Sequence, residues 1–196
     1  MKSNLRPAIV ASAILLVLCG LAYPLAGTGI SQLLFPHQAN GSLNRYGSTL
    51  IGQSWPVGES GPQWFQGRPD GSVLTTGPGG VIVSGTEQLG PRSKQLVEAV
   101  AKRAATLKRE GIVPANDLVT YSGSLVDPDI NPAAAYDQVN AIARARGLPP
   151  AALRRLVTSH IEEPQFGFLG AAYVNVLDLN VALLHVRRSA GPPSSN

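Results

Sequence analysis

Residues 8–35 are AIVASAILLVLCGLAYPLAGTGISQLLF, and this stretch decides how the whole chain is organised. Between Arg6 and Arg45 there is no Asp, Glu, Lys or Arg. A helix rises about 1.5 Å per residue, so residues 8–29 span about 33 Å, which matches the ~30 Å hydrocarbon core of a bilayer. Apolar residues lie on every side of such a helix, so its surroundings are lipid or other helices. The stretch predicts one transmembrane helix.

A cleaved signal peptide and a lipoprotein signal are the alternatives to a retained anchor. The apolar core of a signal peptide has about 7–15 residues and is therefore shorter than this stretch. Pro24 occupies the −3 position of the best cleavage site, which ends at Ala26. Leu18 precedes Cys19 at the position where a lipidated cysteine needs a small residue. We therefore expect a retained anchor that spans the membrane once.

The anchor carries residues that suit close packing against another helix. Small side chains let a second helix approach, and a proline within the span frees a backbone carbonyl that a neighbouring helix can satisfy. The alternative explanation is that small residues are common in any membrane helix. The residues predicted to pack against a partner helix are Ala11, Ser12, Gly20, Tyr23, Pro24 and Gly27.

Positive charges flank the predicted helix mainly on its N-terminal side. Lys2, Arg6 and the α-amino group precede the helix, whereas Arg45 is the first cation after it. Cations within ~15–20 residues of a span favour the cytoplasmic side of the membrane. We therefore expect a single-pass protein of the cytoplasmic (inner) membrane, with its N-terminus in the cytoplasm and its soluble domain extracytoplasmic.

The residues beyond the anchor predict one domain that mixes helices and strands. We divide the chain into the N-terminus and anchor (1–35), a soluble domain (36–188) and a disordered tail (189–196). Residues 36–90 are rich in Gly, Pro, Ser and Thr, which predicts short strands between turns. The apolar pieces expected to form these strands include residues 48–51 and 81–83. Helices dominate the remainder, so the expected fold class is α+β or irregular α/β.

Capping residues define the helices expected in the second half of the domain. One helix begins at Pro91 and ends at Gly111. The next has Asn131 as its N-cap and Pro132 as its first residue, and it ends at Gly147. The other elements expected are strands at 117–121 and 173–176, a helix from Pro149-Pro150 to just before Pro164, and a short helix capped by Asp178 that runs through Val186.

Composition argues against nucleic-acid binding and against cysteine chemistry. The net charge is +4, but the cations share helix faces with Glu98 and Glu110, and aromatic residues make up only 6% of the chain. The one cysteine, Cys19, lies inside the apolar stretch. The soluble domain therefore forms neither a disulfide nor a cysteine-based zinc site. Lipid headgroups remain a partner for its mildly basic surface.

The sequence contains no catalytic motif that we recognise. His37, His160 and His185 lie far apart and share no metal-ligand spacing, and no G-x-S-x-G elbow is present. We expect His160 to be solvated or hydrogen-bonded rather than a ligand. Asp127-Pro-Asp129 is typical of a turn, because Asp bonds to its own backbone and Pro fixes φ. An anchored hydrolase is disfavoured because no nucleophile–base pair is found.

Several motifs occur in a fixed order from about residue 4 to about residue 184. They include PHQANGS at 36–42, GSTLIGQ at 47–53, WFQGRP at 64–69, DPDINPAAA at 127–135 with Gln138 after it, and VNVLDLN at 174–180. The ordered set resembles the KdpC family, the single-span accessory subunits of bacterial potassium-transporting Kdp P-type ATPases. The chain departs from the family pattern at residues 84–89 and 123–127, and at Asp129, where His is frequent. Those two loops therefore differ from the family pattern.

The resemblance implies a membrane complex with other subunits. The partners it implies are a channel-like potassium-binding subunit, an ATP-hydrolysing P-type subunit and a small membrane peptide. This chain is then not an enzyme by itself, but an accessory subunit that stabilises assembly and supports ATP-coupled potassium transport. The absence of an Asp-Lys-Thr-Gly phosphorylation motif agrees with this role.

A nucleotide-binding role is the alternative that the resemblance implies. In that role the subunit raises the affinity of the ATP-hydrolysing subunit for ATP, and Gln138 is the candidate for holding the nucleotide through its amide. We expect no firmly bound cofactor in this chain, with ATP reached only through the complex. The two roles require different topologies, because ATP is cytosolic and a domain outside the membrane does not meet it.

Overall fold

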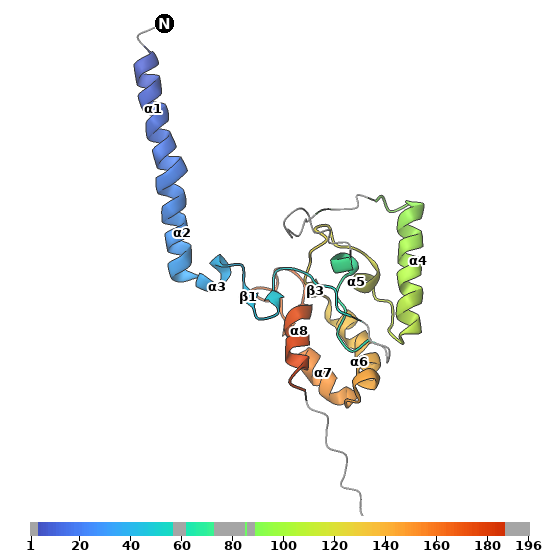
Figure 1. The fold of residues 1–196 in the computed structure, drawn as a ribbon. Helices are drawn as coiled ribbons and strands as arrows, with labels where there is room; N and C mark the ends of the chain where they lie inside the picture. Colours follow the sequence, from blue (N-terminus) through green and yellow to red (C-terminus); the bar gives the residue numbers. More distant parts are fainter. Residues whose placement is uncertain (1–3, 57–61, 73–84, 86–88, 187–196) are drawn as a thin grey trace, which may run out of the picture. The chain divides into compact units, whose positions relative to one another are not determined.

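The computed structural model describes residues 4–56, 62–72, 85 and 89–186. The strand expected at 81–83 and the tail expected at 189–196 lie outside these residues. The chain forms two compact units, Met1–Ser48 and Thr49–Asn196, and each is described by itself. One long N-terminal helix is followed by a unit of mixed helix and strand, which confirms the expected fold class (Figure 1).

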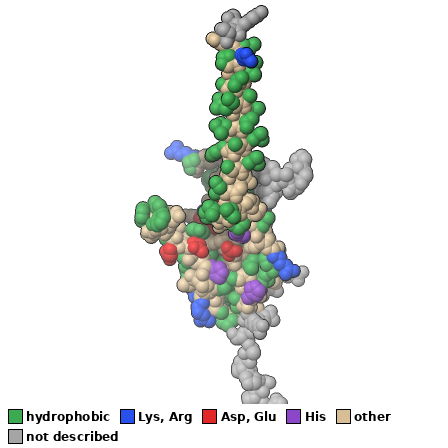
Figure 2. All heavy atoms as spheres, turned by 90° about the vertical axis from the view of Figure 1, so that its left-hand side faces the viewer, with side chains coloured by type: hydrophobic (Ala, Val, Ile, Leu, Met, Phe, Trp, Pro, Cys, Tyr) green, Lys and Arg blue, Asp and Glu red, His purple; other side chains and the backbone are tan. Residues whose placement is uncertain are grey.

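The first unit is built on one continuous helix. It consists of α1 (Leu5–Val17), a π-helical turn (Leu18–Ala22) and α2 (Tyr23–Leu34). Its 30 residues, Leu5–Leu34, are long and apolar enough to cross a membrane, and no part of the apolar window is buried within the protein. Figure 2 shows hydrophobic side chains along the drawn face of this helix. The helix therefore needs lipid or partner helices as its surroundings.

The π-helical turn is explained by the proline that follows it. Pro24 has no N–H, and its ring crowds the carbonyl of Gly20, four residues earlier. The turn before it is widened, so that the N–H of Tyr23 donates to the carbonyl of Leu18, five residues back. Proline and π-helical turns are the usual causes of local irregularity in a long helix.

The first unit also contains a short helix and a hairpin after the long helix. A short helix, α3 (Pro36–Ala39), follows α2, and the Asn40 amide donates to the Gln32 side-chain oxygen at 3.1 Å, which ties the two helices together. A small antiparallel hairpin of β1 (Leu43–Asn44) and β2 (Gly47–Ser48) completes the unit. The strand expected at 48–51 is therefore shorter and begins one residue earlier.

The second unit packs helices against a small antiparallel sheet. Its helices are α4 (Lys94–Arg109), α5 (Asn116–Val119), α6 (Pro132–Arg146), α7 (Pro150–Thr158) and α8 (Val176–Leu183), with a 3₁₀ turn at Pro69–Ser72. Its strands are β3 (Asp129–Ile130), β4 (Ile161–Glu162) and β5 (Tyr173–Asn175). The strand order is β3-β5-β4, so β5 is central and pairs antiparallel with both neighbours.

The core of this unit lies where α6, α7 and α8 meet β5 (Figure 1). Seven of the 15 residues of alanine-rich α6 are buried, because small side chains let its neighbours approach closely. Phe65, from the segment before the 3₁₀ turn, is also fully buried in this core. Other fully buried core residues are Ala134, Ala135, Val139, Ile142, Leu153, Val157, Val174, Leu179 and Leu183.

The ends of α6 are those that the sequence predicts. The Asn131 side chain accepts a hydrogen bond from the N–H of Ala134 at 2.8 Å, and Pro132 is the first helical residue. Gly147 ends the helix in the left-handed region with φ of 63°, a conformation that glycine adopts without steric cost. This helix therefore confirms the capping prediction at both ends.

Other boundaries differ from the predictions. The strand expected at 117–121 is wrong, because α5 occupies it, and the Thr120 hydroxyl donates to the carbonyl of Asn116 at 2.8 Å, which closes a local turn. The helix expected from Pro91 begins at Lys94, since Pro91 lies in a turn in which the N–H of Ser93 donates to the carbonyl of Gly90.

Two further helix predictions also need correction. α7 ends at Thr158, and Ile161 belongs to β4 rather than to the helix, because pairing with Val174 of β5 replaces the helical bonds. Asn175, not Asp178, caps α8: its side-chain oxygen accepts from the N–H of Asp178 at 3.2 Å. α8 ends at Leu183, before the predicted end at Val186.

Candidate functional site

Two buried side-chain amides hold the segment around Phe65 in an extended form. The Asn180 amide accepts from the N–H of Phe65 and donates to its carbonyl, both at 2.9 Å. The Gln138 amide does the same for Gln66, at 2.7 Å to the N–H and 3.0 Å to the carbonyl. Each amide thus supplies the donor and acceptor that a neighbouring strand would supply. The segment is fixed to α6 and α8 without belonging to the sheet.

Gln138 is fully buried, and its polar atoms are engaged within the protein. Its amide N–H groups donate to the carbonyls of Gln66 and Ala134, and its oxygen accepts from Gln66. A nucleotide contact at this position requires these bonds to be broken in the interior of the domain. The geometry gives Gln138 a structural role, and its nucleotide role stays a prediction.

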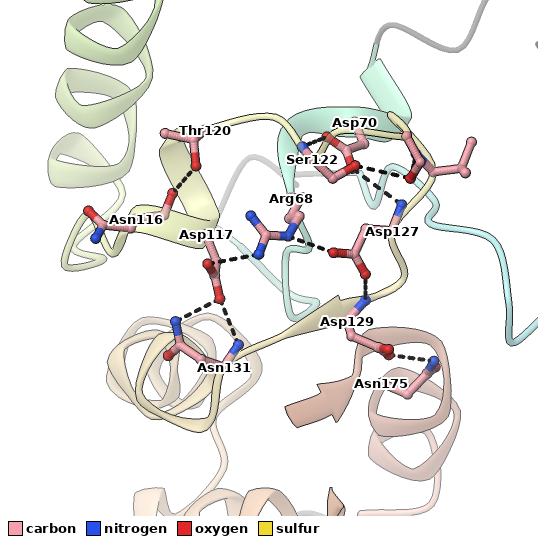
Figure 3. Close-up of polar contacts among 12 residues, drawn as sticks. Arg68, Asp70, Asn116, Asp117, Thr120, Ser122, Asp127, Asp129, Asn131 and Asn175 are labelled. Atoms are coloured by element: carbon pink, nitrogen blue, oxygen red, sulfur yellow. Dashed lines mark hydrogen bonds and ion pairs between the residues drawn. The ribbon is translucent and has the colours of Figure 1, made fainter. Parts of the chain in front are cut away.

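An arginine joins three separate segments of the second unit (Figure 3). The Arg68 guanidinium contacts Asp117 of α5 and Asp127 of the loop before β3, each at 3.0 Å. The second oxygen of Asp117 accepts from the backbone and side-chain N–H groups of Asn131, at 2.7 and 2.6 Å. The ion pairs therefore connect the 62–72 segment to the N-cap of α6.

A buried carboxylate continues this network (Figure 3). Asp70 is fully buried and accepts from the backbone N–H of Ser122 at 2.8 Å, from the Ser122 hydroxyl, and from the backbone N–H of Asp127 at 3.3 Å. Hydrogen bonds from several donors compensate a carboxylate for the loss of water. Asp70 thus fastens the 3₁₀ turn to the loop that carries the Asp127-Pro-Asp129 motif.

The Asp127-Pro-Asp129 motif forms the turn that the sequence predicts. The side chain of Asp127 accepts from the N–H of Asp129 at 3.0 Å, and Asp129 in turn accepts from the Asn175 amide at 2.9 Å. Burial raises the pKa of Asp129 to about 6, with Asp127 adding to the rise and the bond from Asn175 opposing it. Asp129 therefore keeps its proton to a higher pH than an exposed aspartate does.

The sequence analysis did not assign roles to Arg68, Asp70 or Asp117. Arg68 lies in the WFQGRP motif and Asp70 follows it directly, so the motif itself was the available signal. The partners of Arg68 and Asp70 lie 49 or more positions further along the chain, since the nearest pair, Arg68 and Asp117, is separated by 117 minus 68, which is 49. Such long-range pairing gives no local periodicity in the sequence.

A groove of about 560 Å³ runs beside α4 in the second unit. The Arg103 guanidinium lies 3.7 Å from the centre of the Tyr121 ring, an arrangement that suits a cation–π contact. Burial raises the pKa of Glu110, against the opposing effect of Arg109. Charged and aromatic residues that line the groove include Trp55, Arg68, Lys102, Arg103, Glu110 and Tyr121. Gln138 does not line the groove.

The histidines do not form a metal site in the described part of the chain. His160 follows α7, and its Nδ1 lies 2.8 Å from the carbonyl oxygen of Leu156, which confirms the prediction of a hydrogen-bonded histidine. Among the residues that the structure describes, no group of three or more His, Cys, Asp or Glu side chains is placed to hold a metal ion.

Three of the residues predicted to pack against a partner helix line one hollow. Tyr23, Pro24 and Gly27 border a hollow of about 470 Å³ beside α2 and α3. A Cβ added at Gly27 meets no atom within 4 Å, whereas one at Gly20 meets the Leu16 side chain at 3.6 Å. The surface at Gly27 is therefore open to a neighbour.

The other three predicted residues do not join this hollow. Ala11 and Ser12 belong to α1, and Gly20 lies within the π-helical turn. In a regular helix, Ala11 and Gly20 are about two and a half turns apart and point to opposite sides. The packing role of all six residues stays a prediction, with Gly27 the position best placed for it.

These features define a class: a protein with one helix of membrane-spanning length and a soluble α+β unit. The chain belongs to the KdpC family. A model of that family, described as "KdpC: K+-transporting ATPase, c chain", matches residues 5–185. The family resemblance seen in the ordered motifs is therefore confirmed.

Known proteins similar to this chain carry the same family name. A protein of Variovorax paradoxus is 46% identical over 190 residues, which cover 93% of this chain and 96% of the relative. A protein of Sorangium cellulosum is 46% identical over 192 residues, which cover 93% and 98%. A third, from Geobacter sulfurreducens, is 43% identical over 190 residues, which cover 92% and 96%. Each is named "Potassium-transporting ATPase KdpC subunit".

Proposed function

We propose that this chain is a non-catalytic accessory subunit of an ATP-driven potassium uptake complex. It stabilises assembly and supports transport by a potassium-binding channel-like subunit, an ATP-hydrolysing P-type subunit and a small membrane peptide. Its soluble domain lies outside the cytoplasmic membrane, with the N-terminus inside. The observation that carries the proposal is the family match over residues 5–185, because relatives matched over 93% of this chain bear the name of a pump subunit.

The use of polar residues in the second unit supports an accessory role. Gln138, Asn180 and Asp70 are fully buried, and each bonds to the backbone of another segment. Arg68 is likewise engaged in two ion pairs. These side chains connect separate segments of the domain, which supports a structural role in the complex.

The test is removal of this chain from a complex that is otherwise intact. A bacterial strain that depends on this pump for growth in low potassium is deprived of the chain and then complemented with it. We expect growth, potassium uptake and copurification of the other subunits to be lost together and restored together. Full potassium-stimulated ATPase activity in the purified complex without this chain would contradict the proposal.

Nucleotide binding is the second candidate function. The groove beside α4 suits a nucleotide better than the buried position of Gln138 does. Aromatic rings and guanidinium groups there, including Trp55 and Arg103, are the groups that stack on bases and pair with phosphates. ATP is titrated into residues 36–196 and followed by NMR. Saturable shifts at Trp55 and Arg103 would support this second candidate, shifts at Gln138 would require the buried amide to open, and unchanged spectra support the accessory role.

A further inference from the structure

A short loop between β4 and β5 has a well-defined backbone. The N–H of Gln165 donates to the carbonyl of Leu169 at 3.0 Å, and the reverse bond is 2.9 Å. Inside this bridge, the N–H of Gly167 donates to the carbonyl of Pro164 at 2.8 Å. Reciprocal backbone bonds of this kind fix the direction of the residues between them. The loop therefore has a defined, hydrogen-bonded turn between β4 and the central strand β5.

The loop holds two phenylalanine rings in solvent. Phe166 is 79% exposed and Phe168 is 75% exposed. Phe166 also has φ of 56°, in the left-handed region that a phenylalanine rarely adopts. Two neighbouring aromatic rings that are this exposed form an apolar surface, and such surfaces are typical of contacts with another molecule.

The charges around the loop limit what that molecule can be. Residues 164–177 contain no Asp, Glu, Lys or Arg, while Glu162 and Glu163 at the base of the loop are both exposed. Among the described residues, neither of these carboxylates makes an ion pair. An anionic lipid surface repels two carboxylates next to the inserting rings. A protein surface that offers an apolar hollow and basic groups matches both features.

We propose that residues 162–169 dock into an apolar hollow on a partner subunit, with Lys or Arg side chains at its rim facing Glu162 and Glu163. The inference rests on the proposed function, since it takes its partner from the same complex. Phe166 and Phe168 fill the hollow, and the rim charges set the orientation. Buried aromatic anchors surrounded by polar groups are the usual source of binding energy in such interfaces.

Photo-crosslinking in the complete complex identifies the occupant. Benzoylphenylalanine is placed at Phe166 or Phe168 of the full chain, and at Val97 on α4 as the control, because Val97 is 59% exposed. We expect a covalent product with one partner subunit from the two loop positions and none from position 97. Products with lipid alone, or no product at all, would overturn the proposal.

Substitutions separate docking from a structural role. Asn tolerates left-handed backbone better than Phe, so Phe166→Asn is expected to fold at least as stably as the native chain. The doubly substituted F166N/F168N chain is expected to dissociate from the detergent-solubilised complex about tenfold faster or more. The matched control Val97→Asn is expected to leave the dissociation rate unchanged. An unchanged rate in the double variant contradicts the proposal.

The acidic pair gives a second, independent measurement. Glu162→Gln with Glu163→Gln is expected to weaken the salt dependence of dissociation, whereas Glu98→Gln on exposed α4 is expected to preserve it. If removal of the whole chain abolishes transport but these loop variants have no effect, the docking site is wrong and the accessory function stands. If removal of the chain is harmless, the accessory function itself fails.

Discussion

At the scale of single residues, side-chain amides in the second unit make hydrogen bonds that a neighbouring strand makes in larger sheets. Asn180 and Gln138 each offer one donor and one acceptor to the segment around Phe65. The strands themselves have two or three residues each, so they provide few ladder bonds. The two buried amides therefore supply hydrogen bonds that fix the segment around Phe65.

Gln138→Leu is expected to destabilise the soluble domain. The substitution leaves the N–H and carbonyl of Gln66 without their partners inside the domain, which costs about 2–4 kcal/mol. The free energy of unfolding is measured by urea titration of residues 36–196. Gln95→Leu, at an exposed position of α4, is the control and is expected to change it by less than about 0.5 kcal/mol. Equal stability of the two variants would show that the buried amide is not structural.

Asp129 makes the stability of the domain depend on pH. Its pKa is raised from 3.8 to about 6, so the folded state favours the protonated form. The contribution of Asp129 to the free energy of unfolding is therefore most favourable below pH 4, and it is lost as the pH rises through 6. Asp129→Asn, which keeps an acceptor for Asn175, is expected to stabilise the domain by about 1 kcal/mol at pH 7.5, after allowance for solvent screening.

Urea titrations of both proteins at several pH values check this expectation. The difference between Asp129→Asn and the native domain should shrink as the pH falls from 7.5 to 4, because protonation then removes the charge from the native residue. A difference that stays constant over this range would mean that Asp129 does not titrate as its burial implies.

At the scale of elements, the predictable parts were those with local signals. Asn131, Pro132 and Gly147 mark both ends of α6, and each acts through residues within four positions of it. The strand expected at 117–121 is the helix α5, because the adjacent apolar residues Leu118 and Val119 suit a buried helical turn as well as a strand. The ion pairs of Arg68 join residues far apart in sequence, so no local pattern could reveal them.

Arg68→Met is expected to loosen the joint between the 62–72 segment, α5 and β3. It leaves the Asp117 and Asp127 carboxylates, 14% and 33% exposed, without their cation. The expected loss is about 2–3 kcal/mol in the free energy of unfolding, less than for a fully buried pair. Arg68→Lys should give a loss in the free energy of unfolding between that of Arg68→Met and zero, since one ammonium group does not bridge two carboxylates in the same way.

The control for the Arg68 variants is Arg154→Met, at an exposed position of α7. It removes the same charge from the surface and is expected to have little effect. If Arg154→Met and Arg68→Met lower the stability equally, the loss comes from net charge and not from the ion pairs.

At the scale of the whole molecule, the chain combines a membrane-length helix with a soluble domain of its own core. The sequence predicted this arrangement because the absence of charge between residues 6 and 45 is visible without any tertiary information. The faces of the long helix that contact a partner are set by the partner as well. One chain by itself shows only which of its faces are open. Gly27 is the clearest of these positions.

Gly27→Leu is expected to weaken assembly of the complex without disturbing this chain. A Cβ added at position 27 meets no atom within 4 Å, so we expect the effect of a larger side chain to come mainly from a neighbouring helix. Copurification of the partner subunits with the full chain is the measurement. Gly29→Leu is the matched control, because that position is equally open within the chain but points to another side of the helix. Equal recovery with both variants would argue against packing at Gly27.

The most direct test of the account is the side of the membrane on which the soluble domain lies. A reporter is fused after Asn196 of the full chain in a bacterial host. Positive charges before the helix favour a cytoplasmic N-terminus, so alkaline phosphatase, which is active only when exported, should be active in the fusion. Green fluorescent protein at the same position, exported through the Sec route, should stay dark. A fluorescent fusion with inactive phosphatase would contradict the account and would place the domain where it meets ATP.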